Sequence, residues 1–416
     1  MRCFTKVVWL AFLVVLVVST TSLFSDAQTY GVLYSFVPRA GTNPTAGLSM
    51  DQAGNLYGTA SQGGLISYGS VYRLSHKGSS WVFQPLYSFL GGSDGAKPTA
   101  RVIFGPDGAL YGTTSQGGGS GCGGKGCGTV FILRPPPHPA PSVFGNWTIT
   151  ILYRFQGGND GANPGYGDLI FDSSGNLYGT TVNGGTSGAG TIFKLAPSGG
   201  GWTESVLYSF TGGSNGGNPY SGVVLDKSGS LYGTTVNGGV ADGGVVYKLV
   251  PSEGSWTESV LYSFTGGADG GLPYGGVIFD GLGNLYGGTS ADGTGGGGTV
   301  YMLSPSESGW TPTVLFGFAN PGSGTTVGPW SSLIMDPAGR LYGTTSRDGN
   351  DGYGSVFRLT PSSAGVWSYI SLHDFAGGGD GQQPIGSVIL DAKGNIYGTT
   401  FAGGGNNWGL VWEITP

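Results

Sequence analysis

The chain has few of the residues that carry most enzyme chemistry. Its 416 residues include three histidines and three cysteines, and charged residues make up 10% of the composition, against a usual share of ~25%. The formal net charge is −6, so the chain does not have the basic excess that nucleic-acid binding requires. His76, His138 and His373 share no position of the repeat described below. This scatter disfavours a histidine-ligated metal and a Ser-His-Asp triad.

Long apolar runs are also missing, except near the N-terminus. Arg2 and Lys6 precede an apolar run over residues 7–18, and Ser25-Asp26-Ala27 places small residues before a cleavage point. This order predicts a secretory signal peptide over residues 1–27. Because the run is shorter than the roughly 20 residues that cross a bilayer, we expect no membrane span after cleavage. The mature protein is expected to be secreted, or to lie in the periplasm or at the cell surface.

Two cysteines remain in the predicted mature chain, Cys122 and Cys127, within the stretch GCGGKGC. In an exported chain an even number of cysteines favours a disulfide, and four Gly-rich intervening residues can bring the two together. Since the closed loop is small, the bond would gain little chain entropy and would pin one surface loop. A metal site is the weaker alternative, because the loop contains no other ligand-type residue.

Glycine is abundant: 87 of the 416 residues, about three times its usual share. Hydrophobic residues still make up 38% and aromatic residues 12%, enough apolar surface to exclude disorder by composition. The glycines follow a repeat, because a segment centred on an aliphatic residue, Tyr and Gly occurs seven times. Its tyrosines are Tyr57, Tyr111, Tyr178, Tyr232, Tyr286, Tyr342 and Tyr397.

Each repeat divides into four short runs that are typical of β-strands, here called strands A to D. In one unit they read GVVLD (222–226), LYGTT (231–235), VVYKL (245–249) and WTESVLYSF (256–264), separated by turns rich in Gly and Asp. Val, Ile, Tyr, Phe and Thr suit pleated, packed strands. After residue 27 no segment has apolar residues at helical spacing.

The ends of the mature chain indicate how the repeats are arranged. The chain begins with a lone D-type run at 30–36 and ends with a C-type run at 409–414. An open array would leave unpaired strand edges, which natural sheets avoid. A ring closes if 386–391, 395–400 and 409–414 pair with 30–36. The sequence therefore predicts one all-β domain over 28–416: a seven-bladed β-propeller of four-stranded antiparallel blades, with the last blade closed by the N-terminal strand.

The full repeat carries a resemblance to a known family. It reads GxVIFDxxGNLYGTTxxGG…GTVYKL…WTxxVLYSFxGGxDGxxP, and over nearly all of residues 30–416 it resembles the GloVer tandem repeat of exported bacterial choice-of-anchor proteins. The resemblance implies an exported repeat protein and supplies no catalytic residues. Members often end in an anchoring segment, whereas this chain ends at Pro416 directly after a strand, so we expect release. A weaker similarity is to kelch-type propellers.

Two sets of aspartates occupy turns of the repeat. One recurs in every A–B turn and is interpreted as a turn former: Asp51, Asp107, Asp172, Asp226, Asp280, Asp336 and Asp391. The second lies in the D–A loops, in the frame GGxDG: Asp94, Asp160, Asp269 and Asp380. In an antiparallel meander the B–C and D–A loops share one face. We therefore predict an acidic face, with these four residues near the mouth of the central channel.

Carboxylates with backbone carbonyls suit Ca²⁺ or a cationic ligand. No D-x-D-x-D-G calcium loop occurs, however, and Asp-Gly also forms turns without any ligand, which is the interpretation we favour. We therefore expect no cofactor, with Ca²⁺ as the weaker alternative.

Aromatic residues follow the loop proline at the start of strand A in four repeats, directly in three of them and one residue later in the case of Tyr166: Tyr166, Tyr220, Tyr274 and Trp330. Ring faces beside polar groups suit a sugar. Packing between blades is the alternative, and we favour it slightly. The tryptophans that recur at each C–D junction are interpreted as packing residues.

Three functions remain open. The first is a secreted, non-enzymatic propeller that binds a ligand, such as an extracellular glycan or a surface protein, through the acidic face with its aromatic fringe. The second is a secreted polysaccharide lyase or hydrolase that uses two carboxylates at the channel mouth. The third is a structural envelope or matrix module. Because enzyme signals are sparse, we favour the first, and we expect a monomer.

Overall fold

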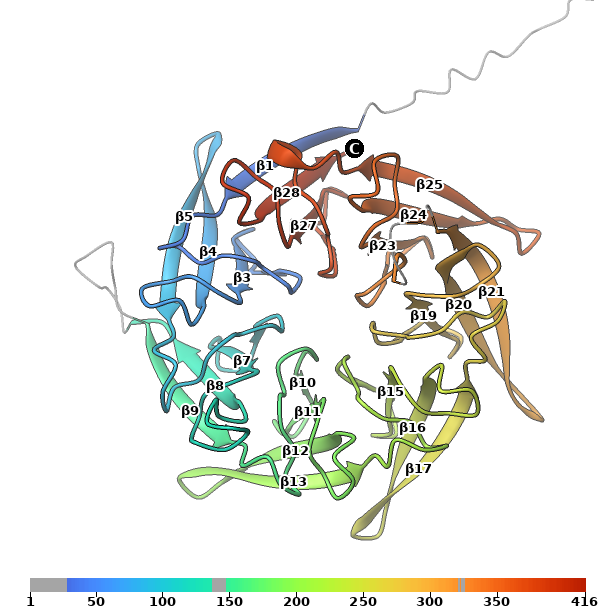
Figure 1. Cartoon of the computed structure of the whole chain (residues 1–416), viewed down its shortest axis with the longest axis horizontal. Coiled ribbons are helices and arrows are strands. Elements are labelled where there is room, and N and C mark those ends of the chain that lie inside the picture. Colours follow the sequence, from blue (N-terminus) through green and yellow to red (C-terminus); the bar gives the residue numbers. More distant parts are fainter. Residues whose placement is uncertain (1–27, 137–146, 321, 323–325) are drawn as a thin grey trace, which may run out of the picture.

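The computed structural model describes residues 28–136, 147–320, 322 and 326–416. Seven four-stranded antiparallel sheets are arranged as blades around a central axis (Figure 1). The predicted seven-bladed propeller is therefore confirmed. The predicted signal peptide over residues 1–27 and His138 lie outside the described residues.

The blades follow the chain, and each runs from a short inner strand to a long outer strand. Blade 1 contains β2 (Ser49–Met50), β3 (Leu56–Ala60), β4 (Ser70–Lys77) and β5 (Ser80–Ser88); blade 2 contains β6 (Ile103–Phe104), β7 (Leu110–Thr114), β8 (Thr129–Arg134) and β9 (Thr148–Arg154). Blade 3 contains β10 (Ile170–Phe171), β11 (Leu177–Thr181), β12 (Thr191–Ser198) and β13 (Gly201–Ser209); blade 4 contains β14 (Val224–Leu225), β15 (Leu231–Thr235), β16 (Val245–Ser252) and β17 (Ser255–Ser263). Blade 5 contains β18 (Ile278–Phe279), β19 (Leu285–Thr289), β20 (Gly296–Ser306) and β21 (Gly309–Ala319); blade 6 contains β22 (Ile334–Met335), β23 (Leu341–Thr345), β24 (Ser355–Pro361) and β25 (Trp367–Asp374). Blade 7 contains β26 (Ile389–Leu390), β27 (Ile396–Thr400), β28 (Leu410–Thr415) and β1 (Thr29–Ser35).

The first and last strands close the ring. β1 pairs antiparallel with β28, with Thr29 opposite Thr415 and Ser35 opposite Leu410. The sheet order of this blade is β1-β28-β27-β26, and Figure 1 shows the blue N-terminal strand beside the red C-terminal strands. The predicted closure of the last blade by the N-terminal strand is confirmed.

The glycine of each Leu/Ile-Tyr-Gly segment is required by the strand opposite it. Gly398 pairs with Trp412 across β27 and β28, and the indole lies over the glycine, so that an added Cβ would stand 2.3 Å from its nearest ring carbon. The same relationship joins Gly179 to Phe193 in blade 3, where the distance would be 2.6 Å. The repeated glycine thus makes room for a large ring in a fully buried position.

The aspartates of the A–B turns hold those turns closed, as predicted. Asp172 accepts hydrogen bonds from the backbone N–H groups of Ser174 and Asn176, both at 2.9 Å, from the Asn176 side chain at 2.7 Å, and from the Tyr178 hydroxyl at 3.0 Å. Burial acts to raise the pKa of Asp172, but these hydrogen bonds outweigh it and hold the pKa below its usual value. The role of Asp172 is structural.

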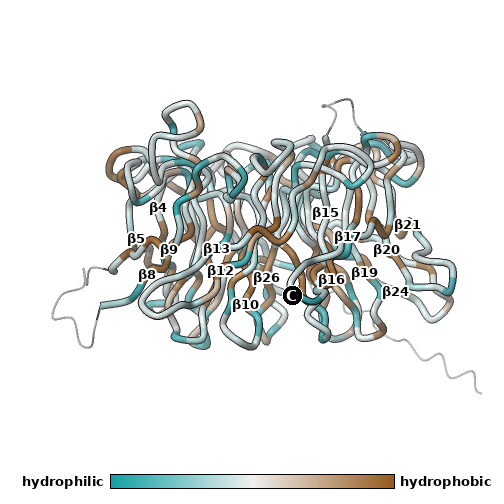
Figure 2. Tube along the Cα trace, turned by 90° about the horizontal axis from the view of Figure 1, so that it is seen from below, coloured by the Kyte–Doolittle hydropathy of each residue, from teal (hydrophilic) through white to brown (hydrophobic). Residues whose placement is uncertain are grey.

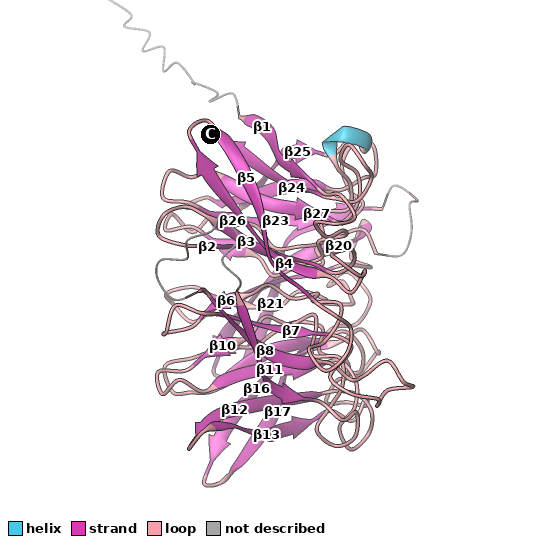
Figure 3. Ribbon diagram, turned by 90° about the vertical axis from the view of Figure 1, so that its left-hand side faces the viewer, coloured by secondary structure: helices cyan, strands magenta, loops and turns pink. Residues whose placement is uncertain are grey.

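The two faces of the disc differ in the loops that they carry. The B–C and D–A loops lie on one face and pair with each other through isolated bridges, such as Ala162 with Asn183 and Gly217 with Asn237. This face also carries η1 (Gly378–Asp380), and Figure 3 shows it on the right, opposite the short hairpin turns. Figure 2 shows most of the hydrophobic segments between the two loop layers, with some in the loops of one face. Within the described ranges, no helix has the length and apolar character needed to cross a bilayer.

Threonines of the B strands connect neighbouring blades next to the axis. The Thr180 hydroxyl donates to the carbonyl of Ser221 in the next blade at 2.8 Å, and Thr234 donates in the same way to Gly275 at 2.9 Å. Thr59, Thr344 and Thr399 make the equivalent bond. The accepting residues belong to the segments that enter the A strands, so these bonds fix the backbone around the central channel.

Candidate functional site

A cavity of about 390 Å³ lies on the propeller axis, where the segments that enter the seven A strands converge. Its volume falls within the range of about 300–1,000 Å³ that is typical of small-molecule sites. Every blade contributes to its wall, from Thr45 in blade 1 to Ser387 in blade 7. The backbone segments of neighbouring blades are closely packed in this wall. An added Cβ on Gly222 would stand 2.2 Å from the carbonyl oxygen of Asp168 in the neighbouring blade.

The four predicted aromatic residues line this cavity together and form an arc over blades 3 to 6. The ring centroids of Tyr166 and Tyr220 are 5.0 Å apart, and those of Tyr220 and Tyr274 are 5.1 Å apart. Tyr274 and Trp330 are stacked, with centroids 4.3 Å apart and an interplanar angle of 2°. The rings therefore pack between blades, as the alternative interpretation held, and they also face the cavity.

The phenols of this arc are neutral in the physiological range. Burial raises the pKa of Tyr220, and burial together with the nearby Tyr220 raises the pKa of Tyr166 and of Tyr274. A neutral phenol both donates and accepts hydrogen bonds. The arc thus offers apolar ring faces with polar groups at their edges.

The remaining wall has smaller side chains. The positions that follow the loop proline are Thr45, Thr99 and Ile385 in blades 1, 2 and 7. The Thr45 hydroxyl donates to the carbonyl oxygen of Thr99 at 3.1 Å, and Thr99 donates to the carbonyl of Gly165. The cavity is therefore asymmetric, with aromatic residues on one side and small residues on the other.

An ion pair that the sequence analysis missed also lies in the wall. A terminal nitrogen of the Arg101 guanidinium is 2.8 Å from Asp168 Oδ2, and the backbone N–H of Arg101 donates to Asp168 Oδ1 at 3.1 Å. The two side chains are 28% and 34% exposed. Among the described residues that line the cavity, Arg101 and Asp168 are the charged ones.

A sequence signal for this pair exists. Each residue lies directly before the buried aliphatic residue that precedes the A strand, Val102 before β6 and Leu169 before β10; this position is here called the pre-strand position. In the other five blades this position holds Gly or Ser: Gly47, Gly222, Gly276, Ser332 and Ser387. Two adjacent blades therefore depart from the repeat with opposite charges, and aligning the repeats at this position would have revealed them.

The four aspartates of the D–A loops do not line the cavity. Asp94 accepts hydrogen bonds from the Tyr87 hydroxyl at 2.9 Å and from the backbone N–H of Leu90 at 2.8 Å. Asp160, Asp269 and Asp380 make the equivalent bonds to Tyr153, Tyr262 and His373 and to their own loops. They are held at the ends of the outer D strands, so the expected position at the channel mouth does not hold. Their hydrogen bonds to the backbone of their own loops are those expected of turn-forming residues.

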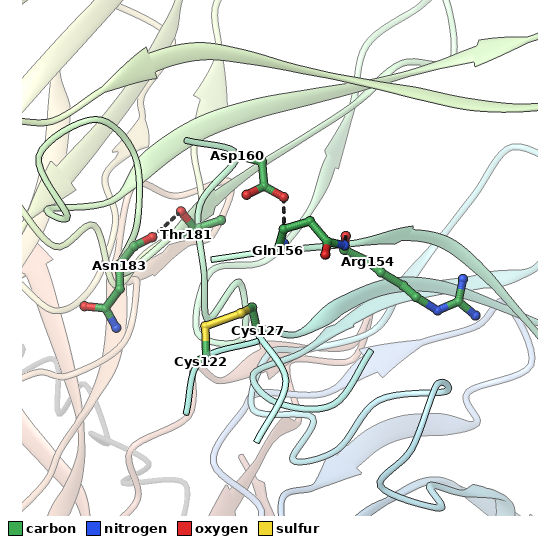
Figure 4. Close-up of a disulfide and its surroundings, with 7 residues drawn as sticks. All are labelled: Cys122, Cys127, Arg154, Gln156, Asp160, Thr181 and Asn183. Carbon is green, nitrogen blue, oxygen red and sulfur yellow. Dashed lines mark hydrogen bonds between the residues drawn. A yellow bond between two sulfur atoms is a disulfide. The ribbon is translucent and has the colours of Figure 1, made fainter. Parts of the chain in front are cut away.

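The disulfide loop supports the neighbouring D–A loop. Cys122 and Cys127 are joined by a disulfide, with their Cα atoms 5.3 Å apart. Figure 4 shows the bond beside Gln156 and Asp160 of the next loop. The fit is close, because an added Cβ on Gly157 would lie 2.6 Å from Cys127 Sγ. The D–A loop that contains Gly157 leads directly to Tyr166 and Asp168 in the cavity wall.

Metal-ligating groups are not gathered in this part of the molecule. Across the residues that the structure describes, no three His, Cys, Asp or Glu side chains are placed so that they could hold a metal ion.

Fold and site together define a seven-bladed β-propeller with an axial cavity. The family model of the Gloeobacter/Verrucomicrobia repeat matches the chain over residues 19–229, 123–326 and 222–416. The chain therefore belongs to this repeat family. A search of the curated proteins finds no match.

Several solved structures match parts of this chain at low similarity. They include a putative oxidoreductase of Thermus thermophilus described as a glucose dehydrogenase (15% identity, TM-score 0.41, 75% of this chain and 95% of that one). An ancestral GH74 enzyme has 14% identity and a TM-score of 0.49, over 88% of this chain and 55% of that one. A further glucose dehydrogenase has 14% identity and a TM-score of 0.46, over 93% of this chain and 99% of that one. Similarity at these levels carries no argument about ligand or activity.

Proposed function

We propose that this protein is exported and binds a carbohydrate in its axial cavity, without chemical turnover. The observation that supports the proposal is the arc of Tyr166, Tyr220, Tyr274 and Trp330 along one wall of a cavity of about 390 Å³. Sugars present apolar C–H faces and polar hydroxyl edges. Aromatic rings with neutral phenol groups beside them complement both.

Binding is favoured over catalysis by the charged groups at the site. Hydrolysis of a glycosidic bond by the common route uses two carboxyl groups that flank the bond. The described cavity wall presents one carboxylate, Asp168, and it is paired with Arg101. The carboxylates of the D–A loops, which the catalytic alternative requires at the channel mouth, are held in the turns of the outer strands.

Export is supported by the signal-like sequence of residues 1–27 and by the disulfide between Cys122 and Cys127, since disulfides persist in oxidising compartments. The repeat family is consistent with this location. A mature N-terminus at residue 28, read from protein purified out of the culture medium or periplasm, would support export.

The test of binding is a glycan array or polysaccharide pull-down with the purified mature protein and with Tyr274→Ala and Trp330→Ala variants. We expect both variants to lose the bound glycan, since each removes a stacking surface. Trp408→Ala is the matched control, because Trp408 is 41% exposed and does not line the cavity. Equal binding by the wild type and both cavity variants would contradict the proposal. No binding by the wild type would favour the structural module.

A further inference from the structure

The Arg101–Asp168 pair identifies the class of carbohydrate, if the proposed function holds. We propose that the axial cavity selects a neutral sugar and binds two adjacent hydroxyl groups with this pair, while a sugar face stacks on the free ring face of Tyr274 or Trp330.

The first step is the charge balance of the cavity. One cation and one anion are present among the described wall residues, and they are 2.8 Å apart. Their charges compensate each other at close range, so the wall offers no unpaired charge to an ionic ligand. An acidic sugar would have to compete with Asp168 for Arg101, and an amino sugar would have to compete with Arg101 for Asp168. A neutral ligand has no such competitor.

The second step is the hydrogen-bonding capacity that the pair retains. A guanidinium has five N–H donors and a carboxylate has about four acceptor sites. Asp168 uses one oxygen for a terminal nitrogen of Arg101 and the other for the Arg101 backbone N–H. Both side chains remain partly exposed toward the cavity. A donor therefore lies beside an acceptor, which matches two neighbouring hydroxyl groups of a sugar ring.

The third step is the departure from the repeat. A purely structural pre-strand residue is small, as Gly47, Gly222 and Ser387 show. Two large charged residues appear in adjacent blades and form a pair at the cavity. The pair also joins blades 2 and 3, where the B-strand Thr113 is buried without a hydrogen-bond partner. A role in blade packing is therefore the competing explanation, and the test requires a readout that packing alone would not move.

That readout is a change of ligand preference. Isothermal titration calorimetry would be performed with three neutral probes, cellohexaose, xylohexaose and mannohexaose, and one acidic probe, trigalacturonate. The proteins are the wild type, Asp168→Asn, Arg101→Met, Arg101→Lys and Trp330→Ala. Asp168→Asn retains the oxygen that accepts from the Arg101 backbone. Trp408→Ala is the control, because Trp408 is exposed and does not line the cavity.

We expect the wild type to bind at least one neutral probe and to bind trigalacturonate more weakly. Asp168→Asn and Arg101→Met should each bind the neutral probe roughly 10- to 100-fold more weakly, as is usual when a hydrogen bond to a charged group is lost. Asp168→Asn should bind trigalacturonate more tightly than the wild type does, because Arg101 is then an unpaired cation. Arg101→Met should not gain this affinity, and Arg101→Lys should retain part of the neutral-sugar affinity.

Two results would overturn the inference and leave the proposed function intact. One is neutral-sugar binding by both variants at wild-type affinity while Trp330→Ala still loses it. The other is a wild-type preference for trigalacturonate. Absence of binding to all four probes by the wild type would count against the proposed function and the inference together. Thermal unfolding of each variant shows whether it is folded.

Discussion

Tyr30 stacks face to face on His373, with ring centroids 3.8 Å apart and an interplanar angle of 1°. Tyr30 belongs to the strand that closes blade 7, and His373 belongs to the outer strand of blade 6. The Tyr30 hydroxyl also donates to the carbonyl oxygen of Asp380 at 2.7 Å, and His373 Nε2 contacts both carboxylate oxygens of Asp380 at 3.1 Å. The loop that contains Asp380 therefore holds the outer strand of blade 6 and the closing strand of blade 7 together.

We predict that Tyr30→Ala weakens ring closure. The substitution removes the stacked ring and the hydrogen bond to Asp380, and truncation of a packed aromatic residue costs roughly 3 kcal/mol. The measurement is the thermal unfolding midpoint, together with limited proteolysis near the N-terminus. Tyr68→Ala, at a 43% exposed tyrosine, should leave both unchanged. A Tyr30→Ala protein as stable as the wild type would show that this contact does not secure the ring.

The repeated glycine gives a second prediction. Gly398→Ala would place a Cβ 2.3 Å from the Trp412 ring, and Trp412 is fully buried. Since overpacking of a core costs about 1–3 kcal/mol, we expect a lower unfolding midpoint in chemical denaturant. Gly281→Ala is the control, because nothing lies within 4 Å of its added Cβ. Equal midpoints for the two variants would disprove the steric role of this glycine.

Glu204 predicts a pH effect on stability. Burial first, and then the charge of Asp160, raise the pKa of Glu204 to about 7. A carboxyl group with a raised pKa stabilises the fold while protonated, and this contribution is lost as pH rises from about 4.5 through 7. Glu204→Gln should therefore gain stability over the wild type at pH 8 relative to pH 5. We expect this gain in the free energy of unfolding to be roughly 1 kcal/mol, because solvent screens the charge of a half-buried group.

The measurement is the difference in unfolding midpoint between Glu204→Gln and wild type at the two pH values. Glu253→Gln, in an exposed turn, is the control and should show the same difference at both. A Glu204→Gln effect that does not change between pH 5 and 8 would argue against a raised pKa.

The disulfide gives a fourth prediction. Replacing Cys122 and Cys127 by Ser should lower stability by roughly 2 kcal/mol, the chain-entropy value for so short a loop. Because the bond packs against Gly157, hydrogen exchange should increase in the D–A loop that leads to Tyr166. Mass spectrometry of the secreted protein should find both thiols oxidised. Free thiols in the secreted protein would contradict the disulfide.

Much of the fold could be predicted from the sequence, because the same strand patterns recur in seven repeats. The single D-type run at 30–36 and the C-type run at 409–414 indicated that the repeats close into a ring, and β1 pairs with β28 as expected. The face of each loop followed from antiparallel connectivity. The conformation of residues within the loops did not follow, because it depends on contacts with the next blade.

The candidate site was predicted in part. The aromatic arc was identified from its position after the loop proline, and the structure places all four rings in the cavity wall. The D–A aspartates were misplaced, because Asp94 and its equivalents turn outward to the hydroxyl groups or imidazole of the D strands. Arg101 and Asp168 were missed because their pairing joins positions 67 residues apart in the sequence. A one-residue insertion before Asp168 also hides the match to the other repeats.

The most direct test is a crystal structure of the mature protein with an oligosaccharide that it binds. We predict electron density for a sugar ring in the axial cavity, stacked against Tyr274 or Trp330, with adjacent hydroxyl groups on Arg101 and Asp168. Density for the sugar only on the outer blades or on the opposite hairpin face, with the axial cavity empty, would contradict the account.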